Sequence, residues 1–351
     1  MTVYKNVSSS FKQKDILVID VGSGTQDVLV YQADKNIENC PKLVMPSNTQ
    51  LVAKQIRQAT RQGQNIYLYG HVMGGGACFF AVKQHLEAGY KVYATKEAAY
   101  TFNDKLEKVR EMGVEIVEIT PDNVCKIRMG DINLAAFDKA LGAFDQALPS
   151  QLAVAVQDHG FSTEESNRIV RFRLLEEFIA KGGLLKNLIF TEQIPEVYTR
   201  MKAVRGAVPG AILTDTGTAA LLGIMADSTV QPHLEKGILA INIGNSHTLI
   251  AAIRGQRIYG LCEHHTGLLN TDSLVSLVKK MQNNELSNDE IFNGGGHGAA
   301  FHPDMTPGWD YIAVTGPQRS IVKPLGWHEV APYGDMMLTG CFGILVGLGI
   351  M

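Results

Sequence analysis

The chain contains, near its N-terminus, the sequence Asp15-Ile-Leu-Val-Ile-Asp-Val-Gly-Ser-Gly-Thr-Gln-Asp-Val-Leu-Val-Tyr31, in which a tight polar turn separates two apolar runs. Both runs are rich in residues that suit a pleated sheet, and Gly22 and Gly24 give the turn backbone freedom, so we predict a β-hairpin. Main-chain N–H groups of such a turn can close on a phosphate, whereas Asp20, at the end of the first strand, would face a cation. An ordinary acidic hairpin turn is the alternative interpretation.

A second stretch repeats this design far downstream: Gly237-Ile-Leu-Ala-Ile-Asn-Ile-Gly-Asn-Ser-His-Thr-Leu-Ile-Ala-Ala-Ile253. Asn242 stands there in the place of Asp20. Two turns of one design, one in each half of the chain, indicate two related domains whose turns face each other across a cleft.

The two turns resemble the phosphate-1 and phosphate-2 motifs of the superfamily that contains actin, sugar kinases, acetate kinase and the seventy-kilodalton heat-shock chaperones. The resemblance implies an α/β fold of two ribonuclease H-like domains, the actin-like ATPase fold, with ATP in the cleft and a hydrated Mg²⁺ held by Asp20. It implies the following residues around the phosphates: Gly22, Ser23, Gly24, Thr25, Gln26, Asn242, Gly244, Asn245, Ser246, His247 and Thr248.

Two further segments carry the same resemblance. The run Tyr311-Ile-Ala-Val-Thr-Gly-Pro317 is similar to the adenosine motif, which implies that Thr315 and Gly316 contact the nucleoside. Proline at 317 replaces the usual second glycine, a departure that weakens the case for adenine recognition. The segment Asp215-Thr-Gly-Thr-Ala-Ala220 matches the first connecting helix, where an aspartate of the carbohydrate kinases acts as general base. Asp215 takes that position here, and a helix N-cap is the alternative interpretation.

Strands and helices are expected to alternate along the whole chain, which predicts parallel or mixed sheets covered by helices. We expect a polar N-terminal extension at 1–14, a first domain at 15–226 and a second domain at 227–351 that ends in a connecting helix. The first domain is longer than a minimal phosphate-binding domain. We therefore expect an α/β insertion at about 92–210 that shapes the substrate site.

Composition limits the function classes. The chain has 351 residues, of which 45% are hydrophobic and 19% charged, and its net charge is −3. This balance suits a globular protein with a large core and argues against a broad nucleic-acid or membrane surface. The first 14 residues lack the apolar segment of a signal peptide, so a cytoplasmic location is expected. The five cysteines stand singly, which predicts neither disulfides nor a zinc ribbon.

The expected insertion contains candidate catalytic residues. Asp158 and His159 follow a predicted strand and could act as an acid/base pair, or could cap the next segment. His71 precedes the glycine run Gly74-Gly-Gly76, which opens a helix and is interpreted either as a structural turn or as a second phosphate site.

Histidines also gather in the second half. Cys262-Glu-His-His-Thr-Gly267 is expected to form a loop after a strand at 257–261. Glu263, His264 and His265, with His297 and His302, could bind a metal, but adjacent histidines point in different directions and no ligand spacing stands out. We favour a role of His264 and His265 in binding substrate, and His71 and His159 are further candidates for that role.

More closely, the segments beginning at His71, Gln157 and Asp215 resemble a family labelled pyruvate formate-lyase-activating-enzyme-like. A radical activase of that kind needs a CxxxCxxC motif, which the sequence lacks. Three functions stay open: an ATP-dependent kinase acting on a small molecule, an ATP-hydrolysing switch acting on a protein client such as a metalloenzyme, and a degenerate fold that binds no nucleotide. Homodimerisation is left open too.

Overall fold

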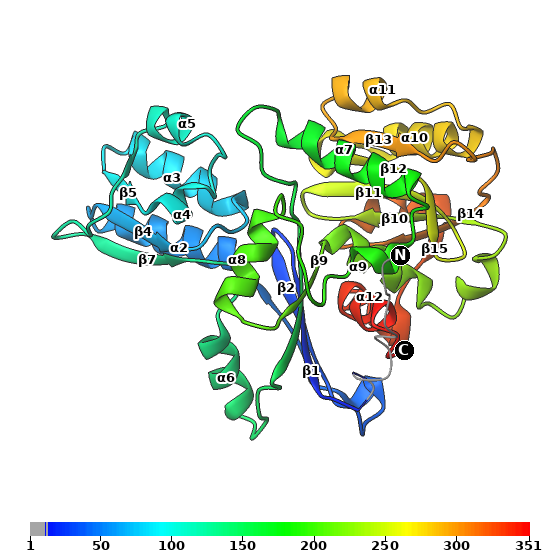
Figure 1. Cartoon of the computed structure of the whole chain (residues 1–351), viewed down its shortest axis with the longest axis horizontal. Helices are drawn as coiled ribbons and strands as arrows, with labels where there is room; N and C mark the ends of the chain where they lie inside the picture. The colour runs from blue at the N-terminus through cyan, green and yellow to red at the C-terminus, as the bar shows by residue number, and fades with distance from the viewer. Residues whose placement is uncertain (1–10, 12) are drawn as a thin grey trace.

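The computed structural model of the protein describes residue 11 and residues 13–351, so the expected N-terminal extension lies almost wholly outside the described part (Figure 1). Three β-sheets, each with covering helices, confirm the α/β class. None of the helices in the described part combines the length and apolar character that a membrane span requires.

The first sheet holds the first glycine hairpin. Its strands lie in the order β3 (Lys42–Pro46), β2 (Thr25–Tyr31), β1 (Ile16–Val21), β8 (Gln151–Val156) and β9 (Ile212–Thr214). Strand β1 is antiparallel to β2 and parallel to β8, which is parallel to β9.

The second sheet is built around the second hairpin. Its strands lie in the order β13 (Gly298–Phe301), β12 (Arg257–His265), β11 (His247–Arg254), β10 (Ile238–Ile243), β14 (Tyr311–Thr315) and β15 (His328–Glu329). Strand β10 is antiparallel to β11 and parallel to β14. The two larger sheets therefore share one topology at their centres, and the prediction of two glycine hairpins is confirmed.

A smaller sheet forms a lobe of its own, at the left of Figure 1. Its four parallel strands are β6 (Val114–Ile116), β5 (Val92–Ala94), β4 (Ile66–Gly70) and β7 (Cys125–Met129). The expected insertion at 92–210 overlaps this lobe only in part. The lobe begins earlier in the sequence, and β8 and β9 return to the first sheet.

Helices cover the sheets. Their bounds are α2 (Asn48–Arg61), α3 (Gly76–Glu87), α4 (Lys96–Ala99), α5 (Leu106–Glu111), α6 (Leu134–Gly142), α7 (Asn167–Ala180), α8 (Thr199–Ala207), α9 (Thr216–Met225), α10 (Thr271–Asn283), α11 (Asn288–Asn293) and α12 (Thr339–Gly347). Periodicity over 97–112 suggests one helix, but the chain breaks there into α4 and α5. Oδ1 of Asn103 accepts a hydrogen bond from N–H of Lys105, a local turn that competes with the helix.

Helices α9 and α12 pack side by side between the two larger sheets (Figure 1). They meet through glycine: a Cβ at Gly223 would lie 1.9 Å from O of Thr339, and one at Gly343 would lie 1.8 Å from O of Ala219. Since no larger residue fits at either position, the small residues of the two connecting helices fix how closely the two halves approach.

Candidate functional site

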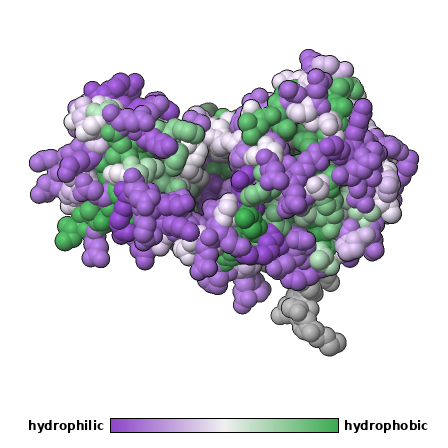
Figure 2. All heavy atoms as spheres, turned by 90° about the horizontal axis from the view of Figure 1, so that it is seen from above, coloured by the Kyte–Doolittle hydropathy of each residue, from purple (hydrophilic) through white to green (hydrophobic). Residues whose placement is uncertain are grey.

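A cleft of about 360 Å³ opens between the smaller lobe and the two larger sheets, and Figure 2 shows this hollow from above. Of the expected nucleotide and metal residues, those that line it are Asp20, Gly22, Ser23, Thr25, Asn242, Gly244, Asn245, Ser246, His247, Thr315 and Gly316. Gln26 and Thr248 are buried elsewhere: Nε2 of Gln26 donates to O of Pro46, and the hydroxyl of Thr248 bonds to that of Thr266. The structure thus brings both predicted turns to one cleft.

The two turns have the same local geometry and touch at their tips. N–H of Gly22 donates to O of Thr25 at 2.9 Å, and N–H of Gly244 donates to O of His247 at 3.0 Å. The hydroxyl of Ser246 donates to that of Ser23 at 2.7 Å. Gly24 packs against Asn245, since a Cβ on Gly24 would lie 2.6 Å from Nδ2 of Asn245.

Two carboxylates stand together at the base of the first turn. Asp20 on β1 lies directly opposite Asp27 on β2. Within the described part of the chain, Oδ1 of each is buried and accepts no hydrogen bond. Burial, followed by the charges of Asp27 and Asp215, raises the pKa of Asp20 well above its usual range, and burial raises the pKa of Asp27 to about 7. Such a pair needs either bound protons or a cation.

This pair meets the requirements of a magnesium ligand set. Oxygen is the donor that Mg²⁺ prefers, and an ion beside the two carboxylates would offset the cost of burying them. Asp27 carries no motif of its own. The signal for it in the sequence is the register of the predicted hairpin, which places residue 27 opposite residue 20.

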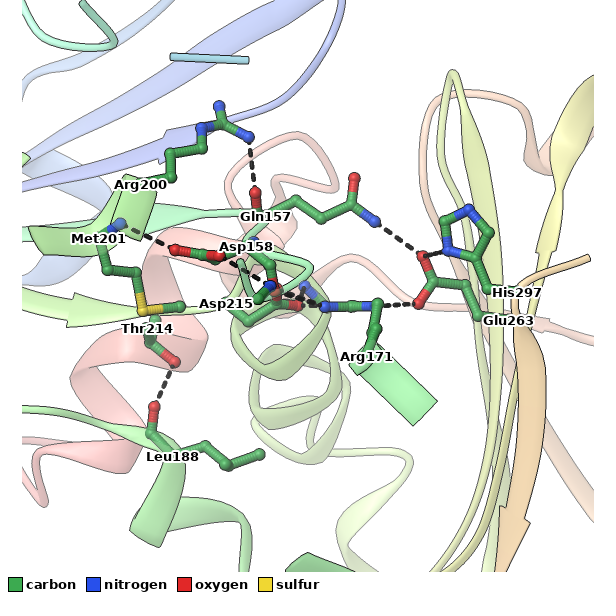
Figure 3. Close-up of polar contacts among 12 residues, drawn as sticks. Gln157, Asp158, Arg171, Leu188, Arg200, Met201, Thr214, Asp215, Glu263 and His297 are labelled. Atoms are coloured by element: carbon green, nitrogen blue, oxygen red, sulfur yellow. Dashed lines mark hydrogen bonds and ion pairs between the residues drawn. The ribbon is translucent and has the colours of Figure 1, made fainter. Parts of the chain in front are cut away.

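Asp215 begins α9 as its N-cap, as the alternative interpretation has it, and accepts N–H of Gly217 at 2.9 Å. Its carboxylate also receives two bonds from the guanidinium of Arg171, at 3.0 and 3.2 Å. Arg171 lies on α7 and bonds through Nε to Oε2 of Glu263 at 2.6 Å, so it links Asp215 to the second sheet (Figure 3). Nothing near residue 171 in the sequence marks this role.

Asp158 is also held by its neighbours. Its Oδ1 accepts N–H of Gly160 and its Oδ2 accepts N–H of Met201, each at 3.0 Å (Figure 3). Burial raises its pKa. The nearby Arg200 pairs with both oxygens of Asp131 and donates to O of Gln157. Asp158 faces the cleft, but hydrogen bonds already occupy both of its oxygens.

The glycine run after β4 also reaches the cleft, where Gly74, Gly75 and Gly76 form part of the wall. A Cβ at Gly74 would lie 2.7 Å from the guanidinium of Arg200, which explains the small residue there. His71, a candidate for substrate binding, is not among the residues that line the cleft.

The expected histidines divide into two groups. Strand β12 continues to His265 and does not end at residue 261, which corrects the expected loop over 262–267. Because side chains alternate along a strand, Glu263 and His265 share one face and His264 points to the other. His264 packs beside Gly296 and α11, and His302 lies apart, where its Nδ1 accepts N–H of Asp304. Glu263 gathers instead with His159, His247 and His297.

The site and fold define a class of protein: two sheets of one topology that present paired glycine turns, with an acidic pair, to a shared cleft. Paired turns at one cleft are among the features that the resemblance to the actin superfamily predicts. Residues 73–321 match the model of a family described as "Putative pyruvate format-lyase activating enzyme (DUF1786)". The match covers well over half of the chain, so the protein belongs to this family, and the closer of the two resemblances stated from the sequence is confirmed.

Solved structures with similarity to the chain include the ethanolamine utilization protein EutJ from Carboxydothermus hydrogenoformans, at 12% identity over 93% of this chain and 88% of that one, with a TM-score of 0.32. A PilM–PilN type IV pilus biogenesis complex matches at 11% identity over 96% and 98%, with a TM-score of 0.36. An Aquifex aeolicus member of the Ppx/GppA family matches at 8% identity over 86% and 66%, with a TM-score of 0.28. These scores are too low to carry an argument. No curated protein matches the chain.

The family description does not fit the cysteines. All five are free, and they lie in different parts of the chain at Cys40, Cys78, Cys125, Cys262 and Cys341. The cluster of a radical activase needs three closely spaced thiolates, and no such spacing occurs in the sequence. The donors that do gather are histidines and carboxylates.

Proposed function

We propose that the two larger sheets are ribonuclease H-like domains of the actin-like ATPase fold, and that the cleft between them binds Mg-ATP for phosphoryl transfer to a small-molecule substrate. The observation that carries this proposal is the buried pair Asp20 and Asp27 beside two facing glycine turns. Phosphoryl transfer is catalysed mainly by positioning and by neutralising charge on the phosphates, which is what such turns and a cation can do.

In this proposal Asp20 and Asp27 hold the magnesium, which neutralises charge on the transferring group when bound. Ser23, Asn245 and Ser246 lie at the turn tips, where side-chain and main-chain donors can reach phosphate oxygens. Gly316 ends β14 with φ +102°, and a Cβ there would lie 2.4 Å from O of Ile243. Only glycine fits there, because the backbone packs directly against the end of β10, and Thr315 and Gly316 line the cleft where the nucleoside is proposed to lie.

A kinase reaction also needs a group that accepts the proton of the substrate hydroxyl. Asp215 is the proposed base, by its position before the second hairpin. Its oxygens are already engaged by Arg171 and Gly217, so accepting a proton would weaken the ion pair with Arg171. Asp158 is engaged in a similar way.

This engagement favours a second candidate function, an ATP-hydrolysing switch that acts on a protein partner. A switch needs no base for a substrate hydroxyl. It does need the two halves of the molecule, each built on one of the larger sheets, to move against each other. Helices α9 and α12 join these halves and meet through glycines, a contact over which packed helices can slide.

The test is a thermal-shift series on the full chain with ATP, ADP or neither, each with and without Mg²⁺. Binding at several times the dissociation constant should stabilise the fold by about 1 kcal/mol or more. ATP consumption across pools of metabolites, compared with phosphate release by the protein alone, then separates a kinase from a switch. Absence of any nucleotide-dependent shift with Mg²⁺ would support the third alternative, a fold that binds no nucleotide.

A further inference from the structure

Three imidazoles and one carboxylate gather in the wall of the cleft. Ligand atoms of His159, His247, Glu263 and His297 all lie within 4.8 Å of one another. The rings of His159 and His247 lie 4.9 and 4.6 Å, centroid to centroid, from the ring of His297. Glu263 and His297 are buried, whereas His159 and His247 are half-buried and line the cleft.

The fold holds these four residues firmly from both halves of the molecule. His247 begins β11 and Glu263 lies on the neighbouring strand β12, opposite Leu249, so both side chains project from the same face of the sheet. N–H of His297 donates to O of Glu263 at 2.8 Å, which places the third residue beside them. His159 comes from the other half, three residues after β8.

The surroundings of two imidazoles and of the carboxylate shift their pKa values. Burial, then the charge of Arg171, lowers the pKa of His159 well below its usual range, and burial lowers the pKa of His247 to about 4. Burial alone raises the pKa of Glu263, but the Arg171 charge and the contact with His297 outweigh it and hold this pKa well below its usual range. Metals bind neutral imidazole and ionised carboxylate.

The ring of His297 offers one nitrogen, Nδ1, as a possible metal ligand. Nδ1 of His297 is buried and lies 3.2 Å from Oε1 of Glu263, and no other residue in the described part of the chain bonds to it. Glu263 itself is oriented by Nε2 of Gln157 at 2.7 Å and by Nε of Arg171 at 2.6 Å (Figure 3). Partners of this kind orient ligating carboxylates in metal sites.

We propose that His159, His247, Glu263 and His297 bind one divalent transition-metal ion, of the Zn²⁺ and Co²⁺ class, in the wall of the cleft. Three nitrogens and one carboxylate oxygen form a donor set typical of such ions, and they differ from the oxygens of Asp20 and Asp27, which suit Mg²⁺. Tetrahedral coordination at 2.0–2.1 Å needs ligand atoms about 3.3 Å apart, so side-chain shifts of about 1 Å would complete the site.

The ion would join the two halves, because one ligand follows β8 of the first sheet and three belong to the second. Its exposed side, between His159 and His247, faces the cleft. A substrate oxygen could therefore reach the ion as a fifth ligand, and the site would serve a kinase or a switch equally. The proposal does not depend on nucleotide binding.

The experiment uses the full chain, stripped with chelator and dialysed. Titration with Co²⁺ is expected to give the visible absorption of a low-symmetry nitrogen and oxygen site with one ion per chain, and Zn²⁺ should displace it. His297→Ala and His247→Gln should each weaken Zn²⁺ binding by at least about a hundredfold, measured by calorimetry. Far-ultraviolet circular dichroism in chelator establishes that each variant is folded.

Two matched variants complete the design. His302→Ala, at a histidine outside the cluster, and Asp20→Asn, in the proposed magnesium site, should keep both the stoichiometry and the affinity for Zn²⁺ and Co²⁺. If the folded wild-type chain gives no visible Co²⁺ bands, or if folded His297→Ala and His247→Gln bind Zn²⁺ as tightly as His302→Ala, the proposal is wrong.

Discussion

The two glycine hairpins share one backbone conformation but carry different side chains at the equivalent position. Asp20 faces Asp27 in the first, and at the same register Asn242 faces Leu249 in the second. The turns close with equivalent hydrogen bonds, and each is supported from the third strand of its sheet: N–H of Ser47 donates to O of Gly24, and N–H of Thr266 donates to O of Ser246.

The difference lies in what fills the space beneath each turn. In the first hairpin the connecting helix α12 places Gly340 against Asp20, where a Cβ would lie 1.9 Å from Oδ2. In the second, α9 places Gly217 against Leu249, where a Cβ would lie 2.9 Å from Cδ2. The backbone thus repeats a turn suited to anions, whereas only the first hairpin carries the acidic pair that can hold a cation.

Alanine substitution of Asp20 and of Asn242, which occupy the same position in the two hairpins, should show that only the first hairpin holds a cation. Asp20→Ala should lower ATP turnover by at least about a thousandfold and change ADP affinity little, since the charge on the transferring group would lose its cation. Asn242→Ala, its counterpart in the second hairpin, should lower turnover by less than about tenfold. Steady-state turnover and ADP calorimetry check both. Equal losses of turnover and ADP affinity in Asp20→Ala would contradict the role of Asp20.

The link between the halves predicts the next effect. Arg171→Met leaves the carboxylates of Asp215 and Glu263 buried without their partner, and should lower the free energy of unfolding by about 3–5 kcal/mol. The control is Arg173→Met on the same helix, which removes an exposed pair with Glu165 and should cost less than about 1 kcal/mol. Urea unfolding measures both. Similar values would show that the buried link does not hold the halves together.

Removal of the proposed base should lower the rate of transfer to substrate by about a hundredfold. If the protein is a kinase, Asp215→Asn should lower transfer to substrate by about that factor and keep the nucleotide-dependent thermal shift, and Asp158→Asn should be milder. Turnover per folded molecule is the quantity to measure, because Asp215 also binds Arg171. Near-normal turnover in a less stable Asp215→Asn variant would assign Asp215 to structure alone.

The smallest effect concerns the glycine beneath the first hairpin. Gly340→Ala should lower the free energy of unfolding by about 1–3 kcal/mol, because the added methyl group displaces the Asp20 carboxylate. Gly206→Ala in α8 is the control: nothing lies within 4 Å of its added Cβ, so stability should stay or rise slightly. A Gly340→Ala variant as stable as Gly206→Ala would show that the first hairpin is not tightly packed.

Elements that a local sequence pattern encodes could be predicted from the sequence. A strand that forms by pairing with a distant segment could not be predicted, and neither could the irregular turn between α4 and α5. The hairpins and most strands follow from apolar periodicity and glycine placement, and the resemblance to the superfamily implied the connecting helix at Asp215. The short strand β7 was missed, and the break between α4 and α5 was not expected. Strand β7 pairs with β4, which lies far from it in the sequence. At the break between α4 and α5, the local hydrogen bond from N–H of Lys105 to Asn103 is joined by one from N–H of the distant Ser162 to Asp104.

The sequence alone therefore established the two turns, because a strand, a glycine turn and a strand encode their own backbone geometry within a few residues. Their repetition predicted a shared cleft, and the packing of the two larger sheets brings both turns to it. The sequence could not establish that Arg171 would bind Asp215 and Glu263, or that His159, His247, Glu263 and His297 would share one site. These contacts join segments far apart in the chain. Each side chain has several local environments open to it, and the packing of whole sheets and helices selects among them.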